Sequence, residues 1–69
     1  MSDKDIIRMA NDISHFFGSY PHDEAVAGVA GHIRDFWDPR MRKALKARIT
    51  EGGAGLEPLV VEAAAKLPG

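Results

Sequence analysis

The sequence predicts a small all-α protein, a bundle of three to four short helices forming one domain over residues 1–69. Three observations predict this fold class. Apolar residues recur every three or four positions along most of the chain, which is the period of one buried helix face. Glycine and proline divide the chain into four such segments. No stretch alternates apolar and polar residues as a half-buried strand would.

The first helix is predicted from Ser2 to about Phe17. Ser2 and Asp5 have the spacing of a capping box, with aspartate in place of the usual glutamate. Gly18 and Pro21 indicate where the helix has ended. The apolar face of this segment is expected to consist of Ile6, Met9, Ala10, Ile13, Phe17 and Tyr20.

The second helix is predicted from His22 or Asp23 to Trp37, and acidic residues at its start suit the helix dipole. Its apolar face is expected to consist of Val26, Val29, Ala30, Ile33 and Trp37. Gly28 and Gly31 lie inside this helix. Either they allow another helix to approach closely, or the helix tolerates them at a cost of about 1 kcal/mol each.

The third helix is predicted from Pro39 to about Thr50. Asp38 can cap its N-terminus, and proline fits the first turn because that position needs no backbone N–H. Basic residues flank a narrow apolar stripe of Met41, Ala44, Leu45 and Ile49.

The fourth helix is predicted from Glu57 or Pro58 to about Lys66, after a glycine-rich break over residues 51–55. Its apolar face is expected to consist of Leu56, Leu59, Val60, Ala63 and Leu67.

The composition limits the class of protein. The net charge is −1 and the isoelectric point is about 6.2, so the whole chain is not a basic nucleic-acid binder. The chain has no cysteine, which excludes disulfides and thiolate metal sites. No apolar run approaches the roughly 18 residues of a membrane span, and the charged N-terminus is unlike a secretory signal. We therefore expect a cytoplasmic protein that, because so short a chain supports only a marginal core, binds a partner.

Some apolar residues lie at or beyond the margins of the predicted faces, namely Ile7, Phe16, Phe36 and Val61. They either widen the core or form an exposed patch that meets another subunit. Trp37 lies near the middle of its stripe, so we expect it to be mostly buried. Its indole N–H would then need an acceptor, for which the corner at Asp38 is a candidate.

Residues capable of chemistry do not form a catalytic or metal-binding pattern. The serines and the threonine lie outside any nucleophile-elbow motif, and residues 52–55 lack the Gly-Lys-Ser/Thr of a phosphate loop. His15 and Asp12 are three residues apart, as are His32 and Asp35. Such pairs favour surface hydrogen bonds or ion pairs over a shared metal site, which needs three or four converging ligands. We therefore predict no catalytic residue, metal ligand or bound cofactor in this chain, and no enzymatic activity of its own.

The strongest indication of a binding surface is the corner from Phe36 to Arg42, where two aromatics adjoin a cluster of cations. Such a composition is typical of protein interfaces. The predicted partner-binding residues are Phe16, Phe36, Trp37, Asp38, Pro39, Arg40, Arg42, Lys43 and Lys46.

The basic helix over residues 39–50 leaves alternatives open, because its cations could contact phosphates, an acidic protein surface or solvent. The cations spread around much of the helix, and no second basic cluster supports a duplex footprint. We therefore predict that the chain binds no nucleic acid and no membrane. A small nucleic-acid-binding or other protein-interaction module is the alternative, and self-association of the isolated chain is left open.

Several strings in the chain resemble one protein family over roughly residues 7 to 64, nearly the whole sequence. They are Arg8-Met9-Ala10-Asn11, Ile13 with Phe16-Phe17, His32-Ile33-Arg34 leading into Phe36-Trp37-Asp38-Pro39-Arg40-Met41-Arg42, and Gly52-Gly53-Ala54-Gly55-Leu56-Glu57-Pro58-Leu59-Val60. The family is the delta subunit of soluble, molybdenum-containing, NAD-dependent formate dehydrogenases.

This resemblance implies a complex in which other subunits oxidise formate to carbon dioxide and reduce NAD. The alpha subunit of that family carries a bis-molybdopterin guanine dinucleotide cofactor and iron–sulfur clusters, and the beta and gamma subunits carry FMN and further clusters. The delta subunit is expected to hold no cofactor. Its implied role is that of an accessory subunit that docks on the alpha subunit, and through it on beta and gamma, to support assembly, stability or maturation of the molybdenum cofactor.

Overall fold

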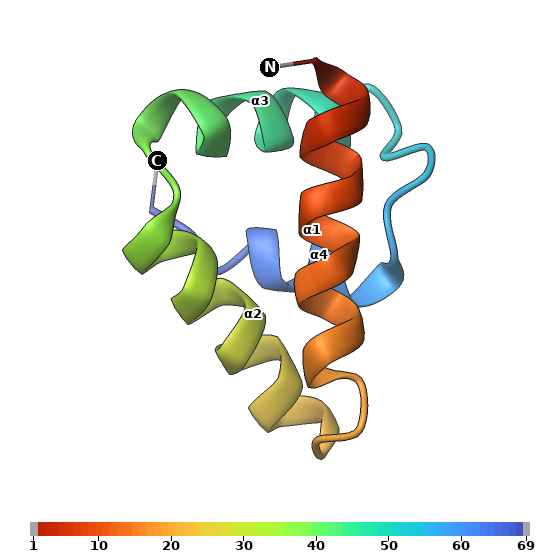
Figure 1. Cartoon of the computed structure of the whole chain (residues 1–69), viewed down its shortest axis with the longest axis vertical. Coiled ribbons are helices and arrows are strands. Elements are labelled where there is room, and N and C mark those ends of the chain that lie inside the picture. The colour runs from red at the N-terminus through yellow and green to blue at the C-terminus, as the bar shows by residue number, and fades with distance from the viewer. Residues whose placement is uncertain (1, 69) are drawn as a thin grey trace.

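A computed structural model describes residues 2–68, and over these residues the chain forms four α-helices and no strand, as predicted. The helices are α1 (Asp3–Phe17), α2 (His22–Phe36), α3 (Pro39–Thr50) and α4 (Pro58–Ala64). In Figure 1, α1 and α2 form a V, α3 crosses its open end, and α4 lies behind the pair. The predicted bounds of α1, α2 and α3 agree with those of the structure to within one residue.

Helix α4 is shorter than predicted, because it ends at Ala64 rather than near Lys66. The backbone N–H groups of Lys66 and Leu67 bond to carbonyls three residues back, at 3.0 and 3.1 Å, so the chain tightens into turns there. Leu67 is buried nonetheless, as its place in the apolar pattern predicted.

The caps that the sequence predicts for α1 and α3 are both present. In the capping box of α1, the Asp5 backbone N–H donates to Ser2 Oγ (3.3 Å) and the Ser2 N–H donates to Asp5 Oδ2 (3.2 Å). At α3 the Met41 N–H donates to Asp38 Oδ1 at 2.9 Å, and Pro39 occupies the first turn. Each cap satisfies N–H groups that have no partner within the helix.

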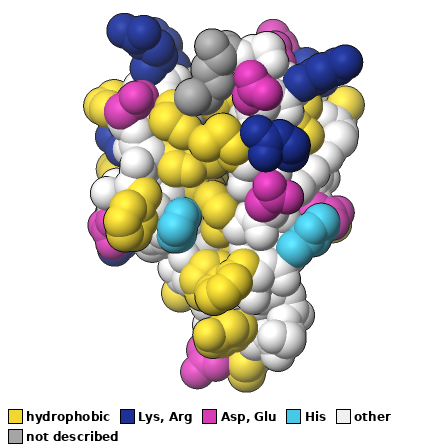
Figure 2. Space-filling model, viewed as in Figure 1, with side chains coloured by type: hydrophobic (Ala, Val, Ile, Leu, Met, Phe, Trp, Pro, Cys, Tyr) yellow, Lys and Arg dark blue, Asp and Glu magenta, His cyan; other side chains and the backbone are white. Residues whose placement is uncertain are grey.

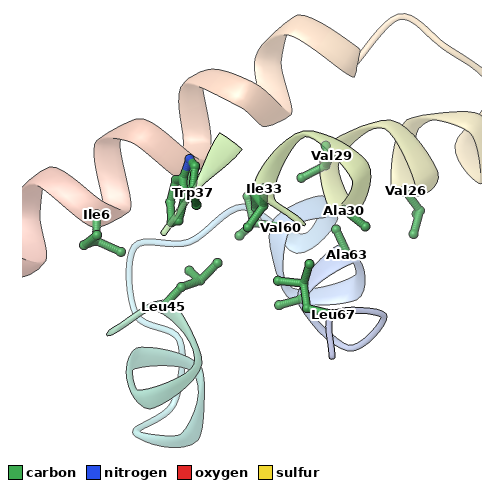
Figure 3. Packing of buried hydrophobic residues seen from close by; sticks show 12 residues of the cluster. Ile6, Val26, Val29, Ala30, Ile33, Trp37, Leu45, Val60, Ala63 and Leu67 are labelled. Carbon is green, nitrogen blue, oxygen red and sulfur yellow. The ribbon is translucent and has the colours of Figure 1, made fainter. Parts of the chain in front are cut away.

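The core lies between the helices and is formed mainly by aliphatic side chains. Val29 and Ile33 of α2, Val60 of α4 and Leu45 of α3 are all fully buried. Figure 3 shows side chains from the four helices directed into this shared interior. All five residues predicted for the apolar face of α2, listed above and including Trp37, are buried.

The predicted apolar face of α1 differs from the buried face at two residues, Ser14 and Tyr20. Ser14 is buried although it is polar, and Tyr20 is 47% exposed although it fits the apolar spacing. The reason for Tyr20 is that α1 ends at Phe17, so the helical period no longer sets the direction of residues beyond it. Ile6 and Ala10 are buried as predicted, and the rest of that face is half-buried against the core.

Gly28 and Gly31 differ in why a glycine is present. A Cβ built at Gly28 would lie 2.5 Å from Cε1 of Phe17, closer than real side chains approach. At Gly31 the nearest atom would be the Arg34 Nη2, at 3.7 Å, which is ordinary contact. Close approach of α1 therefore explains Gly28, whereas Gly31 is simply tolerated.

Polar side chains hold α4 and the loop before it against α1 and α2. The Asn11 amide donates to the Gly55 carbonyl (2.8 Å) and accepts from the Glu57 N–H (2.9 Å). His15 Nε2 lies 2.9 Å from Glu57 Oε1. His15 therefore forms a surface pair with Glu57 and not with Asp12, the partner that the sequence spacing suggested.

A second histidine at the other end of α4 repeats this arrangement. His22 Nε2 of α2 lies 2.7 Å from Glu62 Oε2 of α4.

Among residues 2–68, no helix is both long enough and apolar enough to cross a membrane.

Candidate docking surface

A shallow hollow opens between α1 and α2 on the side of the helix pair away from α4. It has a volume of about 360 Å³ and is lined by Asp12, Ile13, Phe16, Phe17 and His32. Figure 2 shows hydrophobic side chains running down this face along the seam between the two helices, with histidine beside them. Because α4 covers only the opposite side, no helix within residues 2–68 lies over this seam.

Aromatic rings lie in the hollow and next to it, in two separate groups. Phe16 packs edge-on against Phe17 with ring centroids 5.0 Å apart, and Phe17 lies 5.3 Å from Tyr20. On the other wall, the rings of His32 and Phe36 are 4.8 Å apart. We call these five residues the aromatic face.

Within the aromatic face, Phe16 and Phe36 expose 69% and 76% of their surface. They therefore do not widen the core, which was one of the two readings that the sequence left open. Val61 is also exposed, at 37%, whereas Ile7 is half-buried. Single exposed apolar residues are common, but a contiguous exposed apolar patch indicates an interaction site.

Two adjacent aromatic pairs explain why one ring of each pair points outward. Neighbouring residues on a helix are about 100° apart, so they cannot both face the core. Phe17 packs over Gly28, which leaves Phe16 directed to solvent. At the end of α2, Trp37 is buried (5% exposed) and Phe36 is exposed.

Several residues that the sequence assigned to partner binding make contacts within the fold, at the corner between α2 and α3 and near the end of the chain. Trp37 belongs to the core, and its carbonyl accepts a 2.6 Å hydrogen bond from Arg42 Nη1. Asp38 caps α3. The Lys46 ammonium donates to the carbonyls of Leu67 (3.1 Å) and Pro68 (3.3 Å).

The remaining predicted residues of α3 lie on the surface. Pro39, Arg40 and Lys43 are exposed. Arg40 lines a second hollow, of about 350 Å³, together with Asp3, Ile6, Asp38, Met41 and Ala44. The structure thus places Phe16 and His32 in the lining of one hollow, with Phe36 packed against His32, and places Arg40 beside a separate hollow.

Sequence reasoning missed His32 and Tyr20 as parts of the aromatic face. The signal for His32 is its spacing of four residues from Phe36, which puts the two rings on one side of a helix. At the edge of this face, Arg34 Nε donates to Asp35 Oδ1 at 3.0 Å, and this hydrogen bond lowers the pKa of the Asp35 carboxyl. In place of the expected pairing of His32 with Asp35, His32 packs against Phe36 and Asp35 pairs with Arg34.

This surface is suited to binding apolar side chains of another molecule. Phenylalanine and histidine rings line it, and one carboxylate, that of Asp12, reaches it. Within the described part of the chain, no three His, Asp or Glu side chains are grouped so that they could hold a metal ion.

Comparisons with known proteins give the family. No match was found among curated proteins or among solved structures. The family model of the NADH-dependent formate dehydrogenase delta subunit, FdsD, matches residues 5–64. This range includes α1, α2, α3 and α4 apart from the first two residues of α1. The chain therefore belongs to the family of the delta subunits of NADH-dependent formate dehydrogenases.

Proposed function

We propose that this chain is a non-catalytic subunit of a cytoplasmic formate dehydrogenase complex and that it docks on the catalytic alpha subunit through its aromatic face. The observation that carries this proposal is the exposure of Phe16, which lines an apolar hollow, and of Phe36, whose ring packs against His32 of the same hollow. A chain of a subunit family has a partner by definition, and aromatic residues are enriched at the centres of protein interfaces.

Different predicted residues then have different parts in docking. Phe16 and Phe36 are the anchors that contact the partner. Arg40 and Lys43 are exposed and would serve as a basic rim. Arg42 and Lys46 act through the fold, because their end groups bind backbone carbonyls at the α2–α3 corner and at the chain end.

The redox chemistry belongs to partner subunits in this proposal. Formate oxidation, NAD reduction, the molybdenum cofactor, FMN and the iron–sulfur clusters are assigned to the alpha, beta and gamma subunits. This assignment is supported by the ligand requirement of iron–sulfur clusters, which are held by cysteine thiolates that this sequence does not contain.

The hydrogen bonds that Arg42 and Lys46 of α3 make within the chain favour protein docking over nucleic-acid binding. A phosphate-binding helix presents its cations to the ligand. Here the side chains of Arg42 and Lys46 donate to carbonyls of their own chain. The aromatic face, moreover, lies on α1, on the turn after it and on α2 rather than on the basic helix.

The proposal is tested by capturing the tagged chain from cells that express the formate dehydrogenase operon. We expect the wild-type chain to capture the alpha subunit and the double variant Phe16→Ala/Phe36→Ala to capture much less. Val61→Ala, a change at an exposed apolar residue of α4, is the matched control. Circular dichroism verifies that all the variants stay helical. Equal capture by wild type and the double variant would contradict the proposed face.

The molybdenum content of the captured enzyme separates two roles of docking. Capture of the metal-loaded complex indicates a resident subunit that supports stability. Capture of metal-free alpha subunit alone indicates a factor that assists cofactor maturation before assembly is complete.

A further inference from the structure

We infer that the hollow between α1 and α2 receives a basic amphipathic helix of the protein partner, with one large apolar side chain seated in the hollow and a Lys or Arg one turn away paired with Asp12. This inference rests on the proposed docking function and specifies the chemistry of the partner at that same surface.

The lining of the hollow selects for an apolar anchor. Ile13, Phe16, Phe17 and His32 form its walls, and its volume is about 360 Å³. Interface energy is concentrated where an aromatic or aliphatic side chain fills such a pocket and water is excluded. Removal of exposed phenylalanine surface from water adds to the free energy of binding.

Asp12 selects for a cation beside that anchor. It lines the hollow, and its side chain is 65% exposed. Its partner in the chain is Arg8, whose Nη1 lies 3.5 Å from Asp12 Oδ2 on an equally exposed side chain. A pair this long and this solvated contributes little to stability, so the Asp12 carboxylate is available to an incoming cation.

The charge of the surrounding helices agrees with this assignment. Within α1 and α2, six aspartates and glutamates stand against three lysines and arginines. The two helices that form the hollow are therefore acidic, although the chain as a whole carries a net charge of only −1. A basic partner segment is attracted to this surface, and an acidic one is repelled.

The arrangement of the helices indicates that the occupant is itself helical. One side of the α1–α2 pair is already covered by a helix, α4, which packs against both. The seam on the opposite side runs between the same two helices (Figure 2). An amphipathic helix laid along such a seam buries its apolar stripe and completes a second layer over the pair.

A second copy of this chain does not supply such a helix. Its basic helix is α3, and the apolar side of α3 faces the chain's own core: Leu45 is fully buried, and Met41, Ala44 and Ile49 pack against the same cluster. The exposed residues of α3 are Pro39, Arg40, Lys43, Ala47 and Thr50, and none of them offers a large apolar anchor.

The test measures the affinity of the purified chain for formate dehydrogenase complex prepared without it. We expect Asp12→Arg to weaken binding by at least about tenfold and Phe16→Ala to do the same. Asp12→Asn should weaken binding less and should also reduce its dependence on salt. Glu51→Arg is the matched control, because it makes the same change of charge on the α3–α4 loop, outside the hollow.

A photo-crosslinking amino acid in place of Phe16 identifies the occupant directly. Mass spectrometry of the crosslinked complex is expected to locate a helical segment of the partner with Lys or Arg three or four residues from the crosslinked apolar residue. A crosslinked segment without such a cation, or one that belongs to a second copy of this chain, overturns the inference.

The outcomes separate this inference from the docking proposal. If the wild-type chain binds the complex but Asp12→Arg and Glu51→Arg bind equally well, the inference is wrong and docking stands. If the wild-type chain does not bind, docking itself is wrong and the inference falls with it.

Discussion

Helices α2 and α3 are held in the same small bundle by different means. The inner face of α2 is aliphatic, and its Val29 and Ile33 are fully buried. Helix α3 has one buried residue among those described, Leu45. Its position also depends on polar bonds to backbone carbonyls, from Arg42 to Trp37 and from Lys46 to Leu67 and Pro68.

This difference shows that cations clustered on a helix can stabilise the fold itself, whether or not they also bind a partner. The cations of α3 suggested docking because they follow two aromatics in the chain. Arg42 and Lys46 instead fasten α3 to the corner before it and to the chain end after it. The exposed aromatics lie on the helices that are packed by apolar contacts, α1 and α2.

The largest expected effect tests the apolar half of the comparison. Ile33→Ala removes fully buried methyl and methylene groups of α2, so we expect the free energy of unfolding to fall by about 2–5 kcal/mol. Urea denaturation followed by circular dichroism measures this change. The contrast between α2 and α3 is lost if this variant is no less stable than variants of the polar bonds of α3.

The glycines of α2 give the next largest effect, with opposite signs at two positions. Gly28→Ala forces a methyl group against the Phe17 ring, and we expect a loss of about 1–3 kcal/mol. Gly31→Ala meets no such contact and should gain about 0.5–1 kcal/mol from the better helix propensity of alanine. Thermal melts of the two variants, side by side, measure both. A gain at Gly28 would show that α1 can move away without cost.

The polar half of the comparison is tested at Arg42. Arg42→Met keeps much of the aliphatic stem but leaves the Trp37 carbonyl without its partner, which should cost about 1.5 kcal/mol. Lys43→Met is the control, because that residue is exposed and its replacement should change stability by no more than about 0.5 kcal/mol. Equal stability of the two variants would mean that the Arg42 bond does not hold the corner.

The smallest effect concerns the first turn of α1. Hydrogen bonds from the Ser2 backbone N–H, and then from its hydroxyl, lower the pKa of the Asp5 carboxyl. A carboxyl whose pKa is lowered by folding stabilises the fold above its unfolded pKa of about 3.9, and this contribution is lost as the pH falls through the lower folded value. We therefore expect acid to destabilise the wild-type chain slightly more than Asp5→Asn. Melting temperatures at about pH 6 and about pH 2 measure the difference.

Most of the fold could be predicted from the spacing of apolar residues. That spacing predicted the four helices and five buried residues of the α2 stripe, and the residue types at Ser2, Asp5 and Asp38 predicted the two caps. It did not give the partners of polar side chains, because these depend on which helices meet. His15 and Glu57 are 42 residues apart in the sequence, and Asp12, the neighbour that spacing suggested, pairs with Arg8.

The docking surface could be predicted only in part. The angles of Phe16 and Phe36 on their helices allowed either a wide core or an exposed patch. The choice depends on which side of the α1–α2 pair α4 covers, and no local pattern specifies that. The placement of α4 on the far side leaves both rings exposed. The assignment of these residues to partner binding stays a prediction.

The Asn11 side chain bears on the order in which the chain folds. Its two hydrogen bonds reach Gly55 and Glu57, 44 and 46 residues along the sequence. Bonds across such a distance form only after the entropy of closing a long loop has been lost, whereas α1 and α2 are joined by a short turn. We therefore expect the contacts of Asn11 to be absent from the transition state, so that their removal speeds unfolding and leaves the folding rate unchanged. The glycine-rich loop would then be the part of the protein that closes last and opens first.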